Sequence, residues 1–396
     1  MKIVRWMAVF LVFFLLVSSL WAQEPEDLLR SFTRNFAIAS LDVKMQIIQD
    51  AGNSGYSGLG PLYQQAVDYV LDNFSLIGTD QRFRQLAVLA IDQLESARYT
   101  EGKYSVWKLF DTDEDTGVRI SCLNAFGTLA QGDEEIIEYI NLWLQNQNTV
   151  FQTGRVPEMY VVSAAVRTLG ELGDQSSFPV LFATMNVGYT DDISRSAREN
   201  LYRLDGELKD SMIVILKESD LAEKKSALEM SLETDRLKQE EKGEIAQFAL
   251  DVGLHTAAVD NPSRQIARDM RYIAAVALAQ RKWASATDLA IEHFDAVLLE
   301  YDRVLTDKRR VVEAIDCLGA MGTHEAAVRL TQYLVLLNSY TERLREFDNI
   351  IVLAVIENLG SLGDKTAFDD LLYAQYLSYS SEIKKAARDA LENLKW

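Results

Sequence analysis

The chain has 396 residues, of which 48% are hydrophobic and 25% are charged, and its formal net charge at pH 7 is −19. This hydrophobic content is enough for a large core and excludes a mainly disordered chain, while the acidic excess excludes nucleic acid as a favoured partner. Only 5 prolines are present, and Ala, Leu, Glu, Gln, Arg and Lys are abundant, which predicts an all-α protein.

The first residues have the pattern of a secretory signal peptide. Two basic residues precede an apolar run over residues 6–17, and small residues follow the run. We expect cleavage after Ala22, so that a mature protein of residues 23–396 lies in the periplasm or outside the cell. Because Leu20 is larger than the residue that the cleavage rule prefers, retention of this segment as a membrane anchor is the alternative. We expect no membrane span in the mature chain.

Two loops between expected helices have incomplete ligand-binding motifs. Residues 52–60 are rich in glycine, as phosphate-binding loops are, but the Gly-Lys-Ser/Thr ending of such loops is missing. Residues 111–117 place carboxylates at alternate positions like a calcium loop, but Thr116 replaces the expected glycine and Cys122 the expected glutamate. We interpret both segments as structural loops and predict neither a metal ion nor a cofactor.

One pattern recurs along the chain: an apolar helix, a tight turn that contains glycine, and a second apolar helix. In four copies the glycines of this expected turn align, and they are Gly127, Gly170, Gly319 and Gly360. The first two are 43 residues apart and the last two 41 residues apart, a period that suits a helix pair.

Weaker copies occupy other parts of the chain. Residues 193–216 repeat the pattern without the aligned glycine, and residues 224–254 and 266–305 are helical in period but lack the glycine turn. Pro61 and Pro179 are each expected to open a second helix, where the missing N–H has no partner within the helix. Together, the strong and weak copies predict about nine helix pairs.

These residues resemble the HEAT repeat, and residues 166–185 are similar to the subtype first named from phycobilisome lyases. Asp115, Val118 and Arg119 match the loop aspartate and the Val-Arg pair of that family, whereas the other copies lack the arginine. The resemblance implies an armadillo-like, right-handed α-solenoid of about nine stacked helix pairs, formed as a single domain by residues 23–396.

Residues with catalytic chemistry are sparse. The three histidines, His255, His293 and His324, fall at different levels of their expected helices, so they do not form a metal-binding pattern. Cys122 and Cys317 have no histidine nearby in sequence, and we expect two buried free thiols rather than a disulfide. We therefore predict that the protein is not an enzyme.

Tyrosines concentrate toward the C-terminal end and are the candidate partner-binding residues. They are Tyr333, Tyr340, Tyr373, Tyr376 and Tyr379, and the last three have the spacing of one helix face. Aromatic side chains often anchor interfaces, with packing between the last repeats as the alternative. A basic run at residues 308–310, expected in a turn, is interpreted mainly as a solvated charge run, with docking of an acidic partner as the alternative. An expected long loop at residues 145–158 is a second candidate contact region, with a solvent-exposed connection as the alternative.

These features predict an exported, monomeric scaffold or adaptor that binds another protein through the concave face formed by its second helices. Two alternatives remain open. One is a ligand-handling chaperone or lyase-like protein, which would need a pocket with converging polar groups. The other is an envelope component that self-assembles, which would gain mass as its concentration rises.

Overall fold

The computed structural model describes residues 25–77, 80–344 and 346–395. Helices make up most of these residues and none of them belongs to a β-strand, which confirms the predicted all-α class. No helix within these ranges is both long enough and apolar enough to cross a membrane. The predicted signal peptide, residues 1–22, lies outside the described residues.

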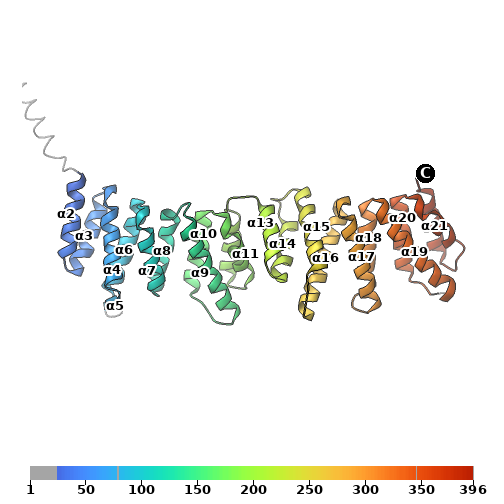
Figure 1. Ribbon diagram of the computed structural model, residues 1–396, viewed down its shortest axis with the longest axis horizontal. Helices are drawn as coiled ribbons and strands as arrows, with labels where there is room; N and C mark the ends of the chain where they lie inside the picture. The colour runs from blue at the N-terminus through green and yellow to red at the C-terminus, as the bar shows by residue number, and fades with distance from the viewer. Residues whose placement is uncertain (1–24, 78–79, 345, 396) are drawn as a thin grey trace, which may run out of the picture. The chain divides into compact units, whose positions relative to one another are not determined.

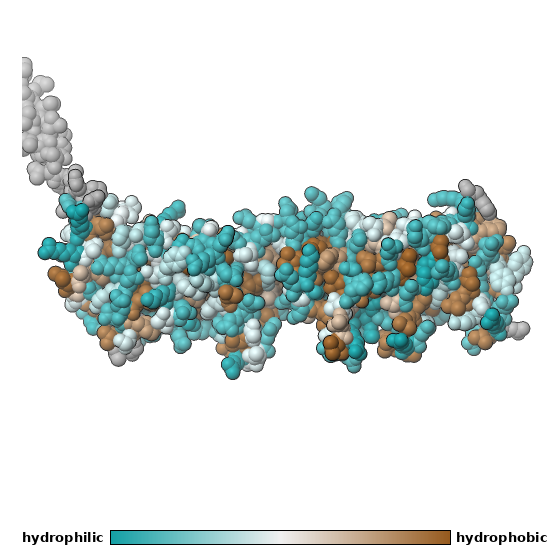
Figure 2. Space-filling model, in the orientation of Figure 1, coloured by the Kyte–Doolittle hydropathy of each residue, from teal (hydrophilic) through white to brown (hydrophobic). Residues whose placement is uncertain are grey.

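The chain divides into two compact units, Met1–Asp205 and Gly206–Trp396. Within each unit the helices stand side by side (Figure 1). Hydrophilic residues cover most of the visible face of each unit, and patches of hydrophobic residues reach the surface among the hydrophilic ones (Figure 2). Each unit therefore has its core between neighbouring helices and a largely polar exterior.

The first unit consists of two rows of α-helices that follow α2 (Pro25–Ile38). The first-helix row is α3 (Leu41–Asn53), α6 (Arg82–Ala97), α8 (Thr116–Leu129), α10 (Met159–Leu172) and α12 (Asp191–Leu201). The second-helix row is α4 (Gly60–Asp72), α7 (Lys103–Thr112), α9 (Glu134–Gln152) and α11 (Phe178–Asn186), with α5 (Phe74–Ile77) after α4. Each member of the first-helix row packs against the next member.

The second unit repeats this arrangement. Its first-helix row is α14 (Leu221–Glu233), α16 (Asn261–Arg281), α18 (Lys308–Met321), α20 (Asn349–Leu362) and α22 (Ser381–Glu392). Its second-helix row is α13 (Leu208–Glu218), α15 (Gln239–His255), α17 (Thr287–Asp302), α19 (His324–Leu344) and α21 (Phe368–Ala374). In both rows each helix packs against the next one.

The four aligned glycines lie inside helices rather than in the turns where the sequence analysis placed them. Gly127, Gly170, Gly319 and Gly360 belong to the last turns of α8, α10, α18 and α20. At each of them an added Cβ would meet the next helix of the first-helix row, for example Ala390 of α22 at 2.9 Å from Gly360. Their alignment therefore reflects a close approach between successive first helices.

A separate set of glycines makes the turns. Gly173, Gly322 and Gly363 follow α10, α18 and α20 with φ angles of 72°, 70° and 68°. These left-handed conformations end the helices at low cost because glycine has no Cβ. In these three copies a glycine does form the turn, as predicted, but it lies three positions after the aligned glycine.

Two other sequence predictions have mixed outcomes. Pro61 and Pro179 stand in the first turns of α4 and α11, which confirms that they open second helices. The long loop predicted at residues 145–158 is wrong, because α9 continues to Gln152 and only the residues between Gln152 and Met159 connect it to α10. Leu144 and Asn148 are buried in α9, and Asn148 donates a hydrogen bond to Thr184 at 3.0 Å. These contacts extend the helix into the predicted loop.

Candidate functional site

A cavity of about 490 Å³ in the second unit lies between α17, α19 and the start of α20. We call it the α17–α19 cavity. Its walls are mainly aromatic and aliphatic side chains, and they come from the last turns of α17, the second half of α19 and the segment that leads into α20. The lining residues are Leu298, Tyr301, Asp302, Tyr333, Leu336, Leu337, Tyr340, Leu344, Glu346, Phe347, Asp348 and Ile351.

The residues that α19 contributes to this wall lie on one face of the helix. Tyr333, Leu336, Leu337, Tyr340 and Leu344 follow one another at spacings of one, three or four residues, so their side chains cover one side of the helix. Tyr333 is 8% exposed, whereas Tyr340 is 49% and Leu344 is 62% exposed. The cavity thus has a buried inner end and an apolar outer edge that is open to solvent.

The ring of Tyr333 closes the inner end of the cavity. It packs edge-to-face against Phe294 of α17, with ring centroids 5.3 Å apart. Burial, and to a lesser extent the negative charge of Asp302, raises the pKa of the Tyr333 hydroxyl to about 12. The phenol therefore stays neutral at physiological pH and can serve as a hydrogen-bond donor.

The carboxylates at the rim have different roles. Asp348 accepts hydrogen bonds from the backbone N–H groups of Ile350 and Ile351 and so caps α20. Its second oxygen lies 3.2 Å from Nζ of Lys308. Asp302 and Glu346 stand at the exposed edge of the cavity. Asp348 is thus a structural residue, and Asp302 and Glu346 give the opening an acidic border.

The residue types in the lining indicate what the cavity can bind. Among the described residues of this wall there is no serine, cysteine or histidine. What the cavity presents is apolar surface, tyrosine hydroxyl groups and carboxylates. Such a site can hold an apolar side chain or a small molecule and orient it by a few hydrogen bonds.

The five predicted tyrosines do not act as one group. Tyr333 and Tyr340 line the α17–α19 cavity, and Tyr373 and Tyr376 are 39% and 78% exposed. Tyr379 is buried, with its hydroxyl group donating to Oδ1 of Asn338 at 3.1 Å. The structure thus brings two of the five together at a cavity and gives Tyr379 a packing role.

The predicted helix face shared by Tyr373, Tyr376 and Tyr379 is wrong. α21 ends at Ala374, and the chain turns before Ser380, whose side chain caps the start of α22. The turn that leads into α22 therefore ends the helical spacing after Tyr373, and no continuous helix presents the three rings on one side.

The basic run at residues 308–310 opens a helix instead of lying in a turn. Asp307 accepts hydrogen bonds from the backbone N–H groups of Arg309 and Arg310 and begins α18 there. The guanidinium of Arg310 stacks over the ring of Tyr272, 4.2 Å from its centroid, and donates to Glu313 at 2.7 Å. Arg310 is thus held against its neighbours.

The acidic loop before α8 uses its carboxylates for structure. Asp113 is 1% exposed and accepts hydrogen bonds from Arg84 at 3.1 and 3.2 Å. Asp115 accepts from the backbone N–H groups of Gly117 and Val118 and caps α8. Both side chains thus hold the loop and the start of α8 in place, as the interpretation of this segment as a structural loop requires.

The histidines occupy three separate environments in the second unit. His293 is fully buried in α17, and neither ring nitrogen has a hydrogen-bond partner in the part of the chain that is described. Burial lowers its pKa to about 3. His255 pairs with Asp251 at 2.9 Å, and His324 with Asp364 at 2.7 Å. The described residues contain no cluster of His, Cys, Asp and Glu side chains suited to a metal ion.

Cys122 and Cys317 are both buried free thiols, as predicted. Burial raises the pKa of Cys317 to about 12 and that of Cys122 further. Because the thiolate is the reactive form, both residues are poor nucleophiles at neutral pH.

Comparison with known proteins leaves the chain without an assigned family. No protein-family model matches it, and no curated protein matches it either.

Proposed function

We propose that this protein is an exported, non-enzymatic scaffold or adaptor built from HEAT-like repeats, and that it binds a segment of another protein through its second-helix row. The observation that carries the proposal is the α17–α19 cavity, an open apolar site between two neighbouring second helices. Interfaces commonly place one or two aromatic or aliphatic anchors in a site of this kind.

The proposed repeat architecture is an armadillo-like, right-handed α-solenoid. Its support is the order of contacts within each unit, where every first helix packs against the next first helix in the chain. Stacked repeats of this kind bury an apolar face that one helix pair could not bury alone. The aligned glycines add support, because they mark the same close approach in four copies.

The cavity indicates what kind of partner segment would fit. Leu336, Tyr340 and Leu344 are each at least 43% exposed and form a continuous apolar edge on α19. Exposed apolar side chains that adjoin a cavity are a common feature of protein-binding surfaces. The partner would therefore insert an apolar side chain, and the acidic border formed by Asp302 and Glu346 would favour a basic residue beside it.

A specific observation also supports the ligand-handling alternative. A volume of about 490 Å³ falls within the range of small-molecule sites, roughly 300 to 1,000 Å³. The hydroxyl group of Tyr333 supplies one polar group in the lining. The distinction between the two functions is whether the natural occupant is part of a protein.

The test uses residues 23–396 as bait in an extract of the cell envelope, with two variants. Tyr340→Ala removes a half-exposed ring of the cavity, and Tyr376→Ala removes a ring that is 78% exposed and does not line it. We expect one protein to be recovered in near-equal amount with the unaltered bait and with Tyr376→Ala. Tyr340→Ala should weaken this binding by about 2 kcal/mol, or roughly 30-fold.

Other outcomes would contradict the adaptor proposal. Native mass spectrometry that finds a co-purified small molecule and no protein would favour the ligand-handling function. A mass that rises with protein concentration would favour self-assembly. Equal losses with Tyr340→Ala and Tyr376→Ala would show that the α17–α19 cavity is not the binding site.

A further inference from the structure

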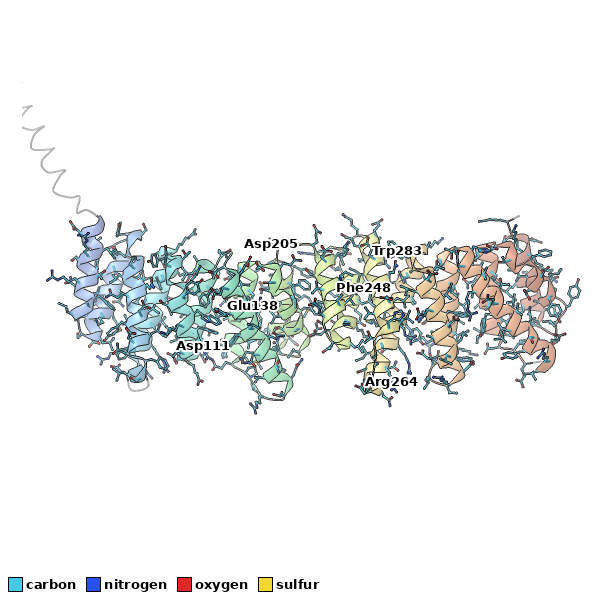
Figure 3. All side chains as sticks on the ribbon, viewed as in Figure 1. Asp111, Glu138, Asp205, Phe248, Arg264 and Trp283 are labelled. Carbon is cyan, nitrogen blue, oxygen red and sulfur yellow. The ribbon has the colours of Figure 1, made fainter. Side chains whose placement is uncertain are left out.

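A second cavity, of about 340 Å³, lies on the first-helix row of the second unit. It extends along the second half of α16, from Tyr272 to Arg281, and is completed by Leu232 of α14 and Arg310 of α18. We call it the α16 cavity. In Figure 3, Arg264 and Trp283 mark the two ends of α16, so this cavity lies toward the end marked by Trp283.

The α16 cavity has a charge opposite to that of the chain. The sequence contains 59 acidic and 40 basic residues, yet Arg281 and Arg310 line this cavity and none of its described lining residues is acidic. A cavity bordered by two guanidinium groups in so acidic a protein is unexpected unless an anion balances it.

Of the two arginines that line the cavity, Arg281 is the one without a charge partner among the described residues. Its Nη1 donates to the backbone carbonyl of Ala277 at 2.8 Å, and its buried Nε has no acceptor within the described residues. No ion pair in the described part of the chain includes Arg281. Burial lowers its pKa, as expected for a cation that loses water and gains no carboxylate. An incoming anion would supply the missing partner.

Arg310 adds a second, partly balanced positive charge to the cavity. Its stacking on Tyr272 and its bond to Glu313 restrict the side chain, which is 39% exposed. Glu313 offsets part of its charge, so Arg281 carries most of the uncompensated charge. A guanidinium that is already oriented loses little freedom when it binds an anion.

We infer that the α16 cavity binds a small organic acid, with its carboxylate at Arg281 and its apolar body against Leu232, Ile273 and Val276. Guanidinium groups match carboxylates in charge and in planar geometry. Guanidinium groups also bind phosphate, but the largely apolar remainder of the lining favours an acid that carries an apolar body.

The volume of the cavity is sufficient for a small organic acid. About 340 Å³ is near the lower end of the range for small-molecule sites. The α16 cavity is lined by first helices, whereas the α17–α19 cavity is lined mainly by second helices. The inference therefore does not rest on the proposed function, and either one can fail without the other.

The test is a calorimetric titration of residues 23–396 with octanoate and with 1-octanol, which has the same chain length and no charge. We expect octanoate to bind and 1-octanol to bind at least about tenfold more weakly. Arg281→Gln should weaken octanoate binding by about ten- to a hundredfold and leave 1-octanol unchanged. Arg281→Lys should give a smaller loss, because it keeps the charge but not the planar fork.

Arg309→Gln is the matched control. Arg309 neighbours Arg310 in sequence, is 82% exposed and does not line the cavity. It should bind octanoate like the unaltered protein, and so should Tyr340→Ala, which disables only the α17–α19 cavity. Circular dichroism would show that each variant is folded.

Three results would overturn the inference. They are the absence of octanoate binding, equal affinities for octanoate and 1-octanol, and equal losses in folded Arg281→Gln and Arg309→Gln. Tighter binding of an acidic peptide than of octanoate, lost in Arg281→Gln, would also overturn it, because the cavity would then accept part of a protein.

Discussion

The aligned glycines lead to a prediction about two substitutions that look alike in sequence and differ in structure. Gly127→Ala and Gly360→Ala each place alanine in the last turn of a first helix. At Gly127, the one close contact of the new methyl group would be Oε2 of Glu171, at 2.6 Å, which is the end of an exposed, flexible side chain; Cβ and Cδ of Glu171 lie at an ordinary 3.7 Å. At Gly360, it would meet Cα and Cβ of Ala390, both at 2.9 Å.

The magnitudes follow from these two contacts. Alanine is more favourable than glycine inside a helix by about 1 kcal/mol. Glu171 can rotate away, so Gly127→Ala should stabilise the first unit by about 0.5 to 1 kcal/mol. At Gly360 the backbone of α22 must move by about half an ångström to reach ordinary contact. Overpacking of this kind costs about 1 to 3 kcal/mol, so the net change should be a loss of about 0 to 2 kcal/mol.

Hydrogen exchange with mass spectrometry is the appropriate assay, because it reports the opening free energy of each unit separately. Peptides from α8 and α10 should gain protection in Gly127→Ala, and peptides from α20 and α22 should lose it in Gly360→Ala. Equal stabilisation by both substitutions would refute the close approach of α20 to α22. A loss of about 2 kcal/mol in Gly127→Ala would show that Glu171 is fixed.

Three further predictions concern buried polar groups. Asp113→Asn removes the charge that pairs with Arg84 and should destabilise the first unit by about 1 to 3 kcal/mol; a loss under about 0.5 kcal/mol in hydrogen exchange would contradict this. Tyr379→Phe removes the hydrogen bond to Asn338 and should lower the free energy of unfolding of the second unit by about 1 kcal/mol without weakening partner capture. If capture were lost, Tyr379 would be a partner-binding residue, as the sequence predicted. The pKa of His293 is lowered to about 3, so on acidification the imidazole takes up a proton in the unfolded chain before it does in the folded one. The free energy of unfolding should therefore fall as the pH drops from about 6.5 toward 3. Urea titrations at several pH values should show a smaller fall in His293→Leu, and an equal fall would contradict the lowered pKa of His293.

Sequence patterns were sufficient to predict the helical class and the repeated helix pairs. Apolar periodicity depends only on which residues face a core, and that information is local. The weak copies at residues 224–254 and 266–305 correspond to the pairs α14–α15 and α16–α17. The aligned glycines were identified correctly as a repeat signal, but their reason was not predictable, because the close contact at Gly360 is made by Ala390 of another helix.

The site was less predictable, because tyrosine spacing does not say where a helix ends. The capping of α22 by Ser380 interrupts the series after Tyr373, and burial of Tyr379 depends on Asn338 in a different helix. Tyr301 was missed, although it lines the same cavity as Tyr333 and Tyr340. No direct signal in the sequence indicated it, because Tyr301 lies in α17 and the other two tyrosines lie in α19.

The position of the α16 cavity has a physical reason in the repeat pattern. α14 and α16 contain no glycine, whereas Gly319 in α18 lets Asn358 of α20 approach so closely that a Cβ would collide with it. Without that glycine, side chains such as Leu232 and Val276 separate neighbouring first helices and can border an open space. The aligned glycines therefore bring successive first helices into close contact, and the weak copy that contains α16 leaves room between first helices. On this reasoning, further openings between first helices should be sought in the segments that lack the aligned glycine.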